Sequence, residues 1–419
     1  MKQIRVLLVA DNVSSRMGGE AAASYNYFRL LPDRGIDVWL VAHGRARNEM
    51  HQMFPDRRDR ISFIEDTFLD KFFVSVFGLF PDKLAGQTFG ALYHLVTQFR
   101  LRRLARSVIR KSEIQLVHQV YPISPRAPSA FYGMTVPVVI GPPLSGGMRY
   151  PPGFSQREGK FARMVESFGR WAAGPMNRMV PGKLQASALL VANQQTHDAL
   201  PAGYGGRVYH SVCEVCVDEV VFDRKPPSRS GRRSVKFAYL GRLVDWKAVD
   251  LLLCAFRRAV DEAGEGSITL DILGDGTERS DLEALAYRLA LDDQVTFHGW
   301  VEPSVAAEKL RQSDVFVLPS LRESGGIVAM EAMALGLPVV VTDWGGPGSN
   351  VPAEAGIKVS PASPEEFISG LATAMVRLAQ SEDLRRQMGD LARRHIQKGH
   401  YFWSEKIKRT IDVYRDVLV

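Results

Sequence analysis

Residues 314–343 of the 419-residue chain read DVFVLPSLRESGGIVAMEAMALGLPVVVTD, a pattern that predicts a strand, a loop, a helix and a second strand. Val315–Leu318 is a short apolar run of the kind found in buried parallel strands. The helix is predicted over Ile327–Leu335, because Gly336 and Pro338 stop it directly afterwards. A buried strand–helix–strand unit of this kind indicates an α/β protein.

Two glutamates mark the helix in this stretch. Glu323 lies just before it and Glu331 lies inside it. The backbone N–H groups of Gly325, Gly326 and Ile327 point out of the helix N-terminus, where the dipole amounts to about half a positive charge. Two glutamates at this spacing could instead belong to a solvated helix face. The two glycines and the buried context favour an anion site, most naturally for a phosphate.

A pair of cations follows another predicted strand, Val235–Leu240. Arg242 and Lys247 lie five residues apart, and a helix is predicted from about Val249. An arginine and a lysine at the mouth of a helix that follows a parallel strand can converge on one diphosphate. The alternative is two solvated surface cations, and the position after a strand favours the diphosphate site.

Both patterns resemble the signatures of a known family, the family 4 retaining glycosyltransferases. In the first signature the matching residues are Glu323, Glu331, Ala332, Met333, Ala334, Gly336, Pro338 and Val339. In the second they are Gly241, Arg242, Leu243 and Lys247. Two positions depart from the family pattern. Gly325 stands where an aromatic residue is usual, and Ala248 stands where a glycine commonly follows the lysine.

The resemblance implies an α/β fold of the GT-B class, with two Rossmann-like domains whose parallel sheets face a central cleft. We place an acceptor-side domain at residues 1–205 and a donor-binding domain at residues 206–400. The final helix, residues 401–419, is expected to cross back to the first domain. An apolar content of 46% and a charged content of 24% fit two ordinary globular domains.

The resemblance also implies roles for individual residues. Four are candidates for catalysis: Glu323, Lys247, Arg242 and His118. Glu323 would contact the transferred sugar, and the two cations would hold the donor diphosphate. His118 lies in the predicted strand Ile114–Val120 and would face the acceptor, although a lone histidine in a strand can equally be a packed core residue.

Donor binding is expected at a larger set of residues: Gly18, Gly19, Arg242, Lys247, Trp300, Val301, Gly325, Gly326, Ile327 and Glu331. Gly18 and Gly19 follow the first predicted strand and would face the donor phosphates. Main-chain atoms of Trp300 and Val301 would meet the nucleotide base. Glu331 would accept hydrogen bonds from the ribose hydroxyls.

The predicted reaction is the retaining transfer of a hexose-type sugar from a nucleotide-diphosphate sugar, UDP- or GDP-linked, to a lipid-linked or polysaccharide acceptor. We expect no metal and no cofactor, because no convincing Asp-x-Asp follows a strand and the cations and amides can stabilise the leaving phosphate. Two alternatives remain open. One is an epimerase or hydrolase of nucleotide sugars with the same fold, and the other is a non-catalytic nucleotide-sugar-binding scaffold.

Charge is divided unevenly along the chain. Residues 1–230 hold 30 Lys and Arg against 19 Asp and Glu, a net charge of +11, whereas residues 231–419 carry −4. A basic front half indicates an anionic partner, and the absence of a nucleic-acid-binding motif argues against nucleic acid. Residues 68–111 include a basic stretch, RLRRLARSVIRK, with leucine, valine and isoleucine at helical spacing. This helix could contact an anionic membrane surface, or its apolar face could pack in the core.

The remaining features bear on compartment and on the acceptor side. Three cysteines fit a reducing compartment, and we interpret Cys213 and Cys216 as buried thiols. No apolar run reaches the roughly 18–20 residues of a membrane span, so we expect a cytoplasmic protein, peripheral on the inner face of the membrane. Residues 145–147 are candidates for acceptor contacts. Residues 149–184 are predicted to form a lid or an acceptor loop.

Overall fold

The computed structural model describes most of the chain. The described residues are 3–17, 19–67, 82–121, 123–144, 148–157, 159–192, 194–210, 216–219, 234–399 and 401–419. Among these residues, none of the helices combines the length and the apolar character that crossing a membrane requires.

The chain divides into two compact units. Unit 1 consists of Met1–Gly147, Lys160–Glu214 and Ser404–Val419, and unit 2 consists of Met148–Gly159 and Val215–Trp403. The predicted domain boundary, after residue 205, lies within the segment Lys160–Glu214 of unit 1. The C-terminal segment Ser404–Val419 groups with unit 1, and the segment Met148–Gly159 groups with unit 2. The predicted domain bounds stay a prediction.

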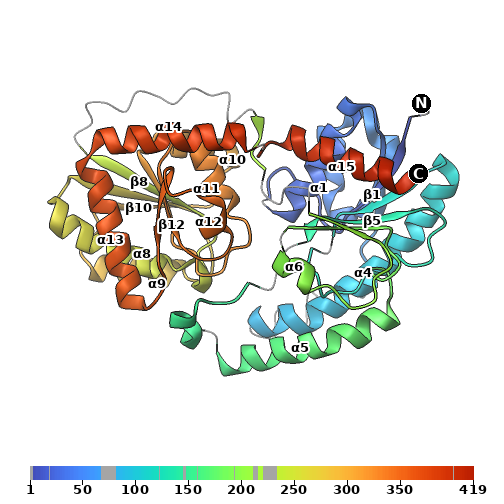
Figure 1. Ribbon diagram of the computed structural model, residues 1–419, viewed down its shortest axis with the longest axis horizontal. Helices are drawn as coiled ribbons and strands as arrows, with labels where there is room; N and C mark the ends of the chain where they lie inside the picture. Colours follow the sequence, from blue (N-terminus) through green and yellow to red (C-terminus); the bar gives the residue numbers. More distant parts are fainter. Residues whose placement is uncertain are drawn as a thin grey trace. The chain divides into compact units, whose positions relative to one another are not determined.

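Unit 1 is built on a seven-stranded sheet in the order β3-β2-β1-β4-β5-β6-β7, and all its strand pairs are parallel (Figure 1). Its strands are β1 (Arg5–Val9), β2 (Asp37–His43), β3 (Ile61–Ile64), β4 (Leu116–Gln119), β5 (Val138–Leu144), β6 (Ala188–Val191) and β7 (Arg207–Tyr209). Its helices are α1 (Glu20–Leu30), α2 (Arg47–Met53), α4 (Asp82–Ser112), α5 (Lys160–Met179), α6 (Gln194–Asp198) and α15 (Trp403–Leu418).

Helix α15 completes the core of unit 1. Tyr414 is fully buried, and its hydroxyl lies 2.6 Å from Nδ1 of His118 on β4. One turn earlier, the Thr410 hydroxyl lies 3.4 Å from the Tyr27 hydroxyl on α1. Because these partners are buried, each contact satisfies polar groups that burial would otherwise leave unpaired. Strand β4 and helix α1 are therefore fixed in part by helix α15.

The basic helix predicted within residues 68–111 is the C-terminal part of α4. Its apolar residues Leu101, Val108 and Ile109 are at most 9% exposed and pack in the core of unit 1. Nη2 of Arg102 donates to the Tyr132 carbonyl at 2.7 Å, and Nη2 of Arg106 donates to the Gly133 carbonyl at 2.8 Å. The structure thus favours the core-packed alternative for this helix over insertion of its apolar face into lipid. Residues 68–81 lie outside the described residues.

Unit 2 is built on a six-stranded parallel sheet in the order β10-β9-β8-β11-β12-β13. Its strands are β8 (Val235–Leu240), β9 (Ile268–Leu273), β10 (Val295–Gly299), β11 (Val315–Leu318), β12 (Val339–Thr342) and β13 (Gly356–Val359). Its helices are α8 (Val249–Ala263), α9 (Arg279–Arg288), α10 (Pro303–Arg311), α11 (Ile327–Ala334), α12 (Gly345–Asn350), α13 (Pro364–Gln380) and α14 (Glu382–Lys398).

Each unit is a parallel sheet combined with helices, and the strand order in each runs outward in both directions from the first strand. The predicted pair of Rossmann-like domains is confirmed, and the predicted strand Val235–Leu240 matches β8 residue for residue. The residues of β11 and β12 are fully buried, as expected for central parallel strands. The cleft between the two domains stays a prediction.

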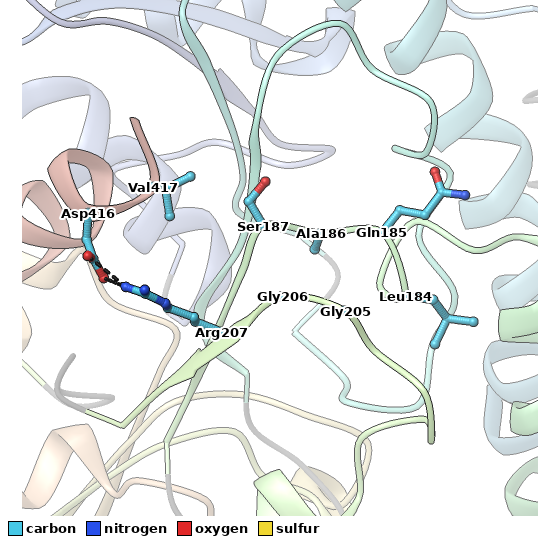
Figure 2. Close-up of a pocket in the computed structure, with 9 residues that line it drawn as sticks. All are labelled: Leu184, Gln185, Ala186, Ser187, Gly205, Gly206, Arg207, Asp416 and Val417. Carbon is cyan, nitrogen blue, oxygen red and sulfur yellow. Dashed lines mark hydrogen bonds and ion pairs between the residues drawn. The ribbon is translucent and has the colours of Figure 1, made fainter. Parts of the chain in front are cut away.

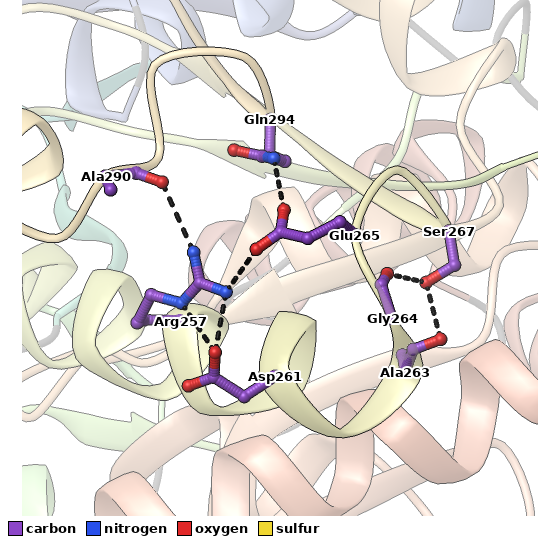
Figure 3. Close-up of polar contacts among 8 residues, drawn as sticks. All are labelled: Arg257, Asp261, Ala263, Gly264, Glu265, Ser267, Ala290 and Gln294. Atoms are coloured by element: carbon purple, nitrogen blue, oxygen red, sulfur yellow. Dashed lines mark hydrogen bonds and ion pairs between the residues drawn. The ribbon is translucent and has the colours of Figure 1, made fainter.

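One charged network ties the C-terminal part of α8 to the loops before β9 and β10 (Figure 3). Nη2 of Arg257 donates to Asp261 and to Glu265 at 2.7 Å each, and Nη1 donates to the Ala290 carbonyl at 3.2 Å. Glu265 also accepts from the Gln294 amide at 2.6 Å. Hydrogen bonds that the guanidinium donates to the Glu265 and Asp261 carboxylates raise the pKa of Arg257. The Arg257 side chain is only 18% exposed, so water screens these interactions weakly. Through them Arg257 links helix α8 to the loops before β9 and β10.

Replacing Arg257 by alanine is expected to lower the free energy of unfolding by about 1–2 kcal/mol, because it removes charge-assisted hydrogen bonds to three segments. The matched control is the neighbouring Arg258→Ala. Arg258 makes an exposed pair with Glu365, at 2.7 and 3.0 Å, and its loss should cost less than about 0.5 kcal/mol. Urea denaturation of the two variants measures the difference, and equal losses would contradict the role assigned to the network.

Candidate functional site

The strand order of unit 2 brings two loops together. Since β8 and β11 are neighbours, the segments that follow them share the carboxyl edge of the sheet. The backbone N–H of Leu321 donates to the Trp246 carbonyl at 2.9 Å, and that of Arg322 approaches the same oxygen at 3.4 Å. These bonds hold Lys247 and Glu323 side by side, and their side chains form an ion pair. The two side chains are 13% and 18% exposed, so the pair is largely shielded from water.

Arg242 lies on the same edge, two residues after β8. Its guanidinium stands over the Trp246 ring at 5.6 Å from the ring centroid, and its carbonyl accepts from the Tyr239 hydroxyl at 3.0 Å. Burial of Tyr239, with the negative charge of Glu323 nearby, raises the pKa of that phenol. The hydroxyl is therefore neutral and remains a hydrogen-bond donor to the loop that carries Arg242.

Ala248 joins the turn Asp245–Lys247 to helix α8 in a left-handed conformation, with φ 53° and ψ 39°. A residue with a Cβ atom pays about 1–2 kcal/mol in this region, which glycine occupies without strain. Although alanine replaces glycine at this position, the backbone keeps the left-handed conformation that glycine would favour. The strain is carried beside Lys247, at the start of the helix that follows it.

The loop from Glu323 to Gly326 is clamped by the segment after β12. The N–H of Gly346 donates to the Glu323 carbonyl at 3.0 Å, and the Asn350 side chain donates to the Gly325 carbonyl at 2.8 Å. Gly326 is the N-cap of α11 and has φ 71° and ψ 42°. Among the described residues, no partner is recorded for the N–H groups of Gly325, Gly326 and Ile327. The clamp leaves these donors available for an anion.

The Gly346→Ala variant tests this clamp. A Cβ atom at Gly346 would lie 2.0 Å from the Ser324 carbonyl oxygen, so the loop has to shift. We expect a lower thermal midpoint and at least a tenfold weaker affinity for a nucleoside diphosphate, measured by calorimetry. The control is Gly174→Ala on α5, where a Cβ atom would meet nothing within 4 Å. Unchanged nucleotide affinity in Gly346→Ala would contradict the importance of the loop geometry.

Glu331 lies on the second turn of α11 and is partly buried. Burial, reinforced by the nearby Asp218 carboxylate, raises the pKa of Glu331 to about 7. The folded protein therefore favours the neutral carboxyl over the charged one. A protonated carboxyl donates one hydrogen bond and accepts others, and both functions suit a pair of vicinal hydroxyls.

The stability of the protein should depend on the ionisation of Glu331. Because its folded pKa of about 7 lies above the ordinary 4.5, the folded chain keeps a proton that the unfolded chain has lost, and stability falls as pH rises between these values. Glu331→Gln should match the wild type near pH 4.5 and exceed its free energy of unfolding by about 1–3 kcal/mol at pH 8. Urea denaturation at the two pH values tests this. The exposed control Glu262→Gln should show no such difference.

A segment from the middle of the chain packs on the same loops. In unit 2, Nε of Arg322 donates to the Met148 carbonyl at 3.0 Å, and the Trp344 indole donates to the Arg149 carbonyl at 2.8 Å. The guanidinium of Arg322 also stands over the Tyr150 ring, 5.3 Å from its centroid. Residues 148–157, which we call the strap, therefore brace the loops after β11 and β12.

The strap also braces the loop after β8. The Tyr150 hydroxyl donates to Asp245 at 2.7 Å, and Arg157 pairs with Asp250 and approaches the Asp245 carboxylate at 3.4 Å. Asp245 opens the turn that ends at Lys247. Sequence reasoning missed these contacts, since it treated residues 149–184 as one lid or acceptor loop. No local sequence pattern predicts the strap contacts, because the residues that the strap contacts are far away in the sequence.

Other predicted site residues occupy different places. Gly19 caps α1 with φ 64° and ψ −124°, a conformation that only glycine adopts without strain, and Gly18 lies outside the described residues. Trp300 and Val301 directly follow β10, and Trp300 is 59% exposed. These positions lie after strands, where ligand contacts are expected, and their roles stay predictions.

His118 is placed differently from the prediction. Its ring is fully buried, with Nδ1 at 2.6 Å from the Tyr414 hydroxyl and Nε2 bonded to the Gly141 carbonyl. Burial lowers the pKa of His118 to about 4, so the ring is neutral. Both nitrogens are engaged inside unit 1, and neither is directed at an acceptor. The structure favours the alternative of a packed core histidine, and we remove His118 from the catalytic candidates.

Two further predictions concern Cys213 and the segment 145–147, and both lie outside the described residues. Cys216 is buried, as predicted, and forms no disulfide bond with another described residue. Within the described part of the chain, no group of three or more His, Cys, Asp or Glu side chains is arranged to hold a metal ion.

A pocket of about 590 Å³ lies elsewhere, in unit 1 (Figure 2). It is lined by Ser187 and Gly206, which directly precede β6 and β7, and by the Arg207–Asp416 pair at 2.8 Å. It therefore lies at the amino ends of these strands. Ligands of open parallel sheets bind at the carboxyl ends, so this pocket is not the candidate site.

Comparison with known proteins agrees with this geometry. Residues 234–380 match the family model described as glycosyl transferases group 1. An uncharacterised glycosyltransferase of Methanocaldococcus jannaschii is 32% identical over 42% of this chain and 44% of its own length. A D-inositol 3-phosphate glycosyltransferase of Streptomyces griseus is 34% identical over 43% of this chain and 39% of its own length. The chain thus matches about two fifths of the length of these relatives.

Solved structures are similar over the whole chain. Sucrose-phosphate synthase of Thermosynechococcus elongatus has a TM-score of 0.69 at 17% identity and covers 99% of both chains. Anabaena HepE, solved with UDP and glucose, has a TM-score of 0.65 at 15% identity and covers 99% of this chain and all of its own. At these identities the likeness shows the fold, which is GT-B. Residues 234–380 are thus similar to the glycosyl transferases group 1 family.

Proposed function

We propose that the protein is a retaining, metal-independent glycosyltransferase. It moves a hexose-type sugar from a nucleotide-diphosphate sugar, UDP- or GDP-linked, to a lipid-linked or polysaccharide acceptor. The observation that carries this proposal is the shielded Lys247–Glu323 pair at the carboxyl edge between β8 and β11, beside the open amides of Gly325, Gly326 and Ile327. A cation, a carboxylate and free N–H donors at one point suit a diphosphate and the sugar attached to it.

The leaving diphosphate is the group that this site would stabilise. Lys247 and Arg242 would neutralise it, and the amides at the start of α11 would donate to its oxygens. On donor binding, Lys247 would exchange Glu323 for phosphate oxygens, which frees the carboxylate to face the sugar ring as positive charge develops there. The low exposure of the pair strengthens each of these interactions. Glu331 would bind the ribose hydroxyls, and Trp300 and Val301 would meet the base.

The anomeric configuration is retained if the bond that breaks and the bond that forms lie on the same face of the sugar. The bond between the anomeric carbon and the diphosphate breaks, a bond to the acceptor oxygen forms on the same face, and the acceptor proton passes to the departing phosphate. No covalent nucleophile is needed, because positioning and fixed charges lower the barrier. The name of the Streptomyces relative and the UDP bound to HepE support a nucleotide-sugar donor. The low cysteine content supports a cytoplasmic site of action.

A donor panel tests the proposal. UDP-, GDP- and ADP-sugars are incubated with the protein in EDTA, and hydrolysis and transfer are followed by chromatography. We expect one donor to be turned over. Glu323→Gln and Lys247→Gln should each lower kcat by about 10²–10³, the usual effect of removing one charge-stabilising group. The exposed variant Glu262→Gln serves as the control and should retain full activity.

Other outcomes would replace the proposal. Turnover that EDTA abolishes would contradict metal independence. An isomerised nucleotide sugar, or hydrolysis that no acceptor diverts, would indicate an epimerase or a hydrolase. Tight nucleotide binding without turnover of any donor would indicate a binding scaffold.

A further inference from the structure

Unit 1 has the same strand order as unit 2. In both sheets the chain runs outward in one direction from the first strand, through β2 and β3 or through β9 and β10, and then in the other direction from β4 or β11. Ligands of open parallel sheets bind outside the carboxyl ends of the strands where this direction reverses. In unit 2 that point lies between β8 and β11, where Lys247 and Glu323 meet. In unit 1 it lies between β1 and β4.

Four titratable side chains surround this point of unit 1, each from a different segment. They are Asp11, two residues after β1; Glu20, the first residue of α1; His94, on α4; and Tyr121, two residues after β4. We call them the switch-point cluster. Asp11 Oδ2 lies 2.8 Å from Nδ1 of His94, and the Tyr121 hydroxyl lies 3.3 Å from Nε2 of the same ring. The result is a chain of carboxylate, imidazole and phenol.

The switch-point cluster is shielded but accessible. The Asp11 side chain is 12% exposed and the His94 side chain is 40% exposed, so solvent reaches the imidazole. Burial raises the pKa of Glu20 to about 7, with His94 lowering it and Asp11 raising it further. Burial, together with the charges of Glu20 and Asp11, also raises the pKa of Tyr121, so the phenol stays neutral. Two carboxyl groups thus face one imidazole and one phenol.

This chemistry is opposite to that of the donor site. Arg242 and Lys247 surround the switch point of unit 2, whereas carboxyl groups surround that of unit 1. A phosphate would be repelled by Asp11 and by ionised Glu20. A neutral hydroxyl group can donate to a carboxylate and accept from the imidazole or the phenol. Closely spaced hydroxyls of a sugar or polyol would satisfy several of these groups at once.

We propose that Asp11, Glu20, His94 and Tyr121 bind the hydroxyl-bearing part of the acceptor, a neutral sugar or polyol group, at the switch point of unit 1. The assignment of this ligand as an acceptor rests on the proposed function, whereas the binding itself does not. The Asp11 carboxylate accepts from one hydroxyl and holds the His94 ring through Nδ1. Nε2 of His94 exchanges the Tyr121 hydroxyl, which lies 3.3 Å away, for a ligand hydroxyl, so that the imidazole and the phenol can both contact the ligand. Any anionic part of the acceptor lies away from this point.

Direct binding tests the proposal without any nucleotide sugar. Saturation-transfer NMR on the full chain uses inositol, glucose and glycerol as probes, with inorganic phosphate as a competitor. We expect at least one polyol to bind, and phosphate at equal concentration to leave that binding unchanged. Asp11→Asn and Tyr121→Phe should each raise its apparent Kd at least tenfold. The matched control Asp59→Asn, at an exposed position of the same unit, should bind like the wild type.

The outcomes separate the two proposals. If no polyol binds, if phosphate displaces it, or if Tyr121→Phe binds as tightly as wild type, the switch-point cluster is not this site. Tyr121→Phe removes only one oxygen atom, so it guards against loss of binding through misfolding, which thermal unfolding of each variant also monitors. If the protein turns over no donor but binds a polyol in a way that depends on Asp11, the proposed glycosyltransferase activity is wrong and the proposed polyol site stands.

Discussion

Two backbone hydrogen bonds hold the candidate site together. The carbonyl of Trp246 accepts from Leu321 and Arg322, and these bonds fix the loop after β8 against the loop after β11. Lys247 and Glu323 are far apart in the sequence, and each loop alone could take many conformations. Once the loops are joined, the two side chains pair with little further loss of conformational entropy. The strap adds a second layer, because Tyr150 and Arg157 hold the turn that ends at Lys247.

The two units use one arrangement for two kinds of chemistry. Each has a point where its strand order reverses, and each gathers ionisable side chains there. In unit 2 these are cations and a paired carboxylate, suited to a diphosphate. In unit 1 they are carboxyl groups with an imidazole and a phenol, suited to hydroxyl groups. Under the two proposals, a shared backbone plan would set where ligands bind, and the residues after β1, β4, β8 and β11 would determine which ligands they are.

Much of unit 2 could be predicted from the sequence because its signals are local. The strand Val315–Leu318 and the helix starting at Ile327 follow from apolar runs and glycines that are adjacent in the chain. The pairing of Lys247 with Glu323 could not be predicted, because it requires that β8 neighbours β11, and the two strands are far apart in the sequence. The ionisation of Glu331 could not be predicted, because it depends on burial and on Asp218, a residue from a distant segment. The burial of His118 under Tyr414 depends on the last helix of the chain for the same reason.

The path of the chain constrains how the protein can be made. The chain passes between the units at residues 147/148, 159/160, 214/215 and 403/404, so neither unit is a continuous piece. During synthesis the strap, residues 148–157, is translated long before the strands of unit 2 whose following loops it contacts. Unit 1 waits longer still, since Thr410 and Tyr414 are translated after the strands of both sheets. A nascent chain therefore holds an incomplete unit 1 while unit 2 is translated, with the buried groups of β4 and α1 uncovered until α15 is released.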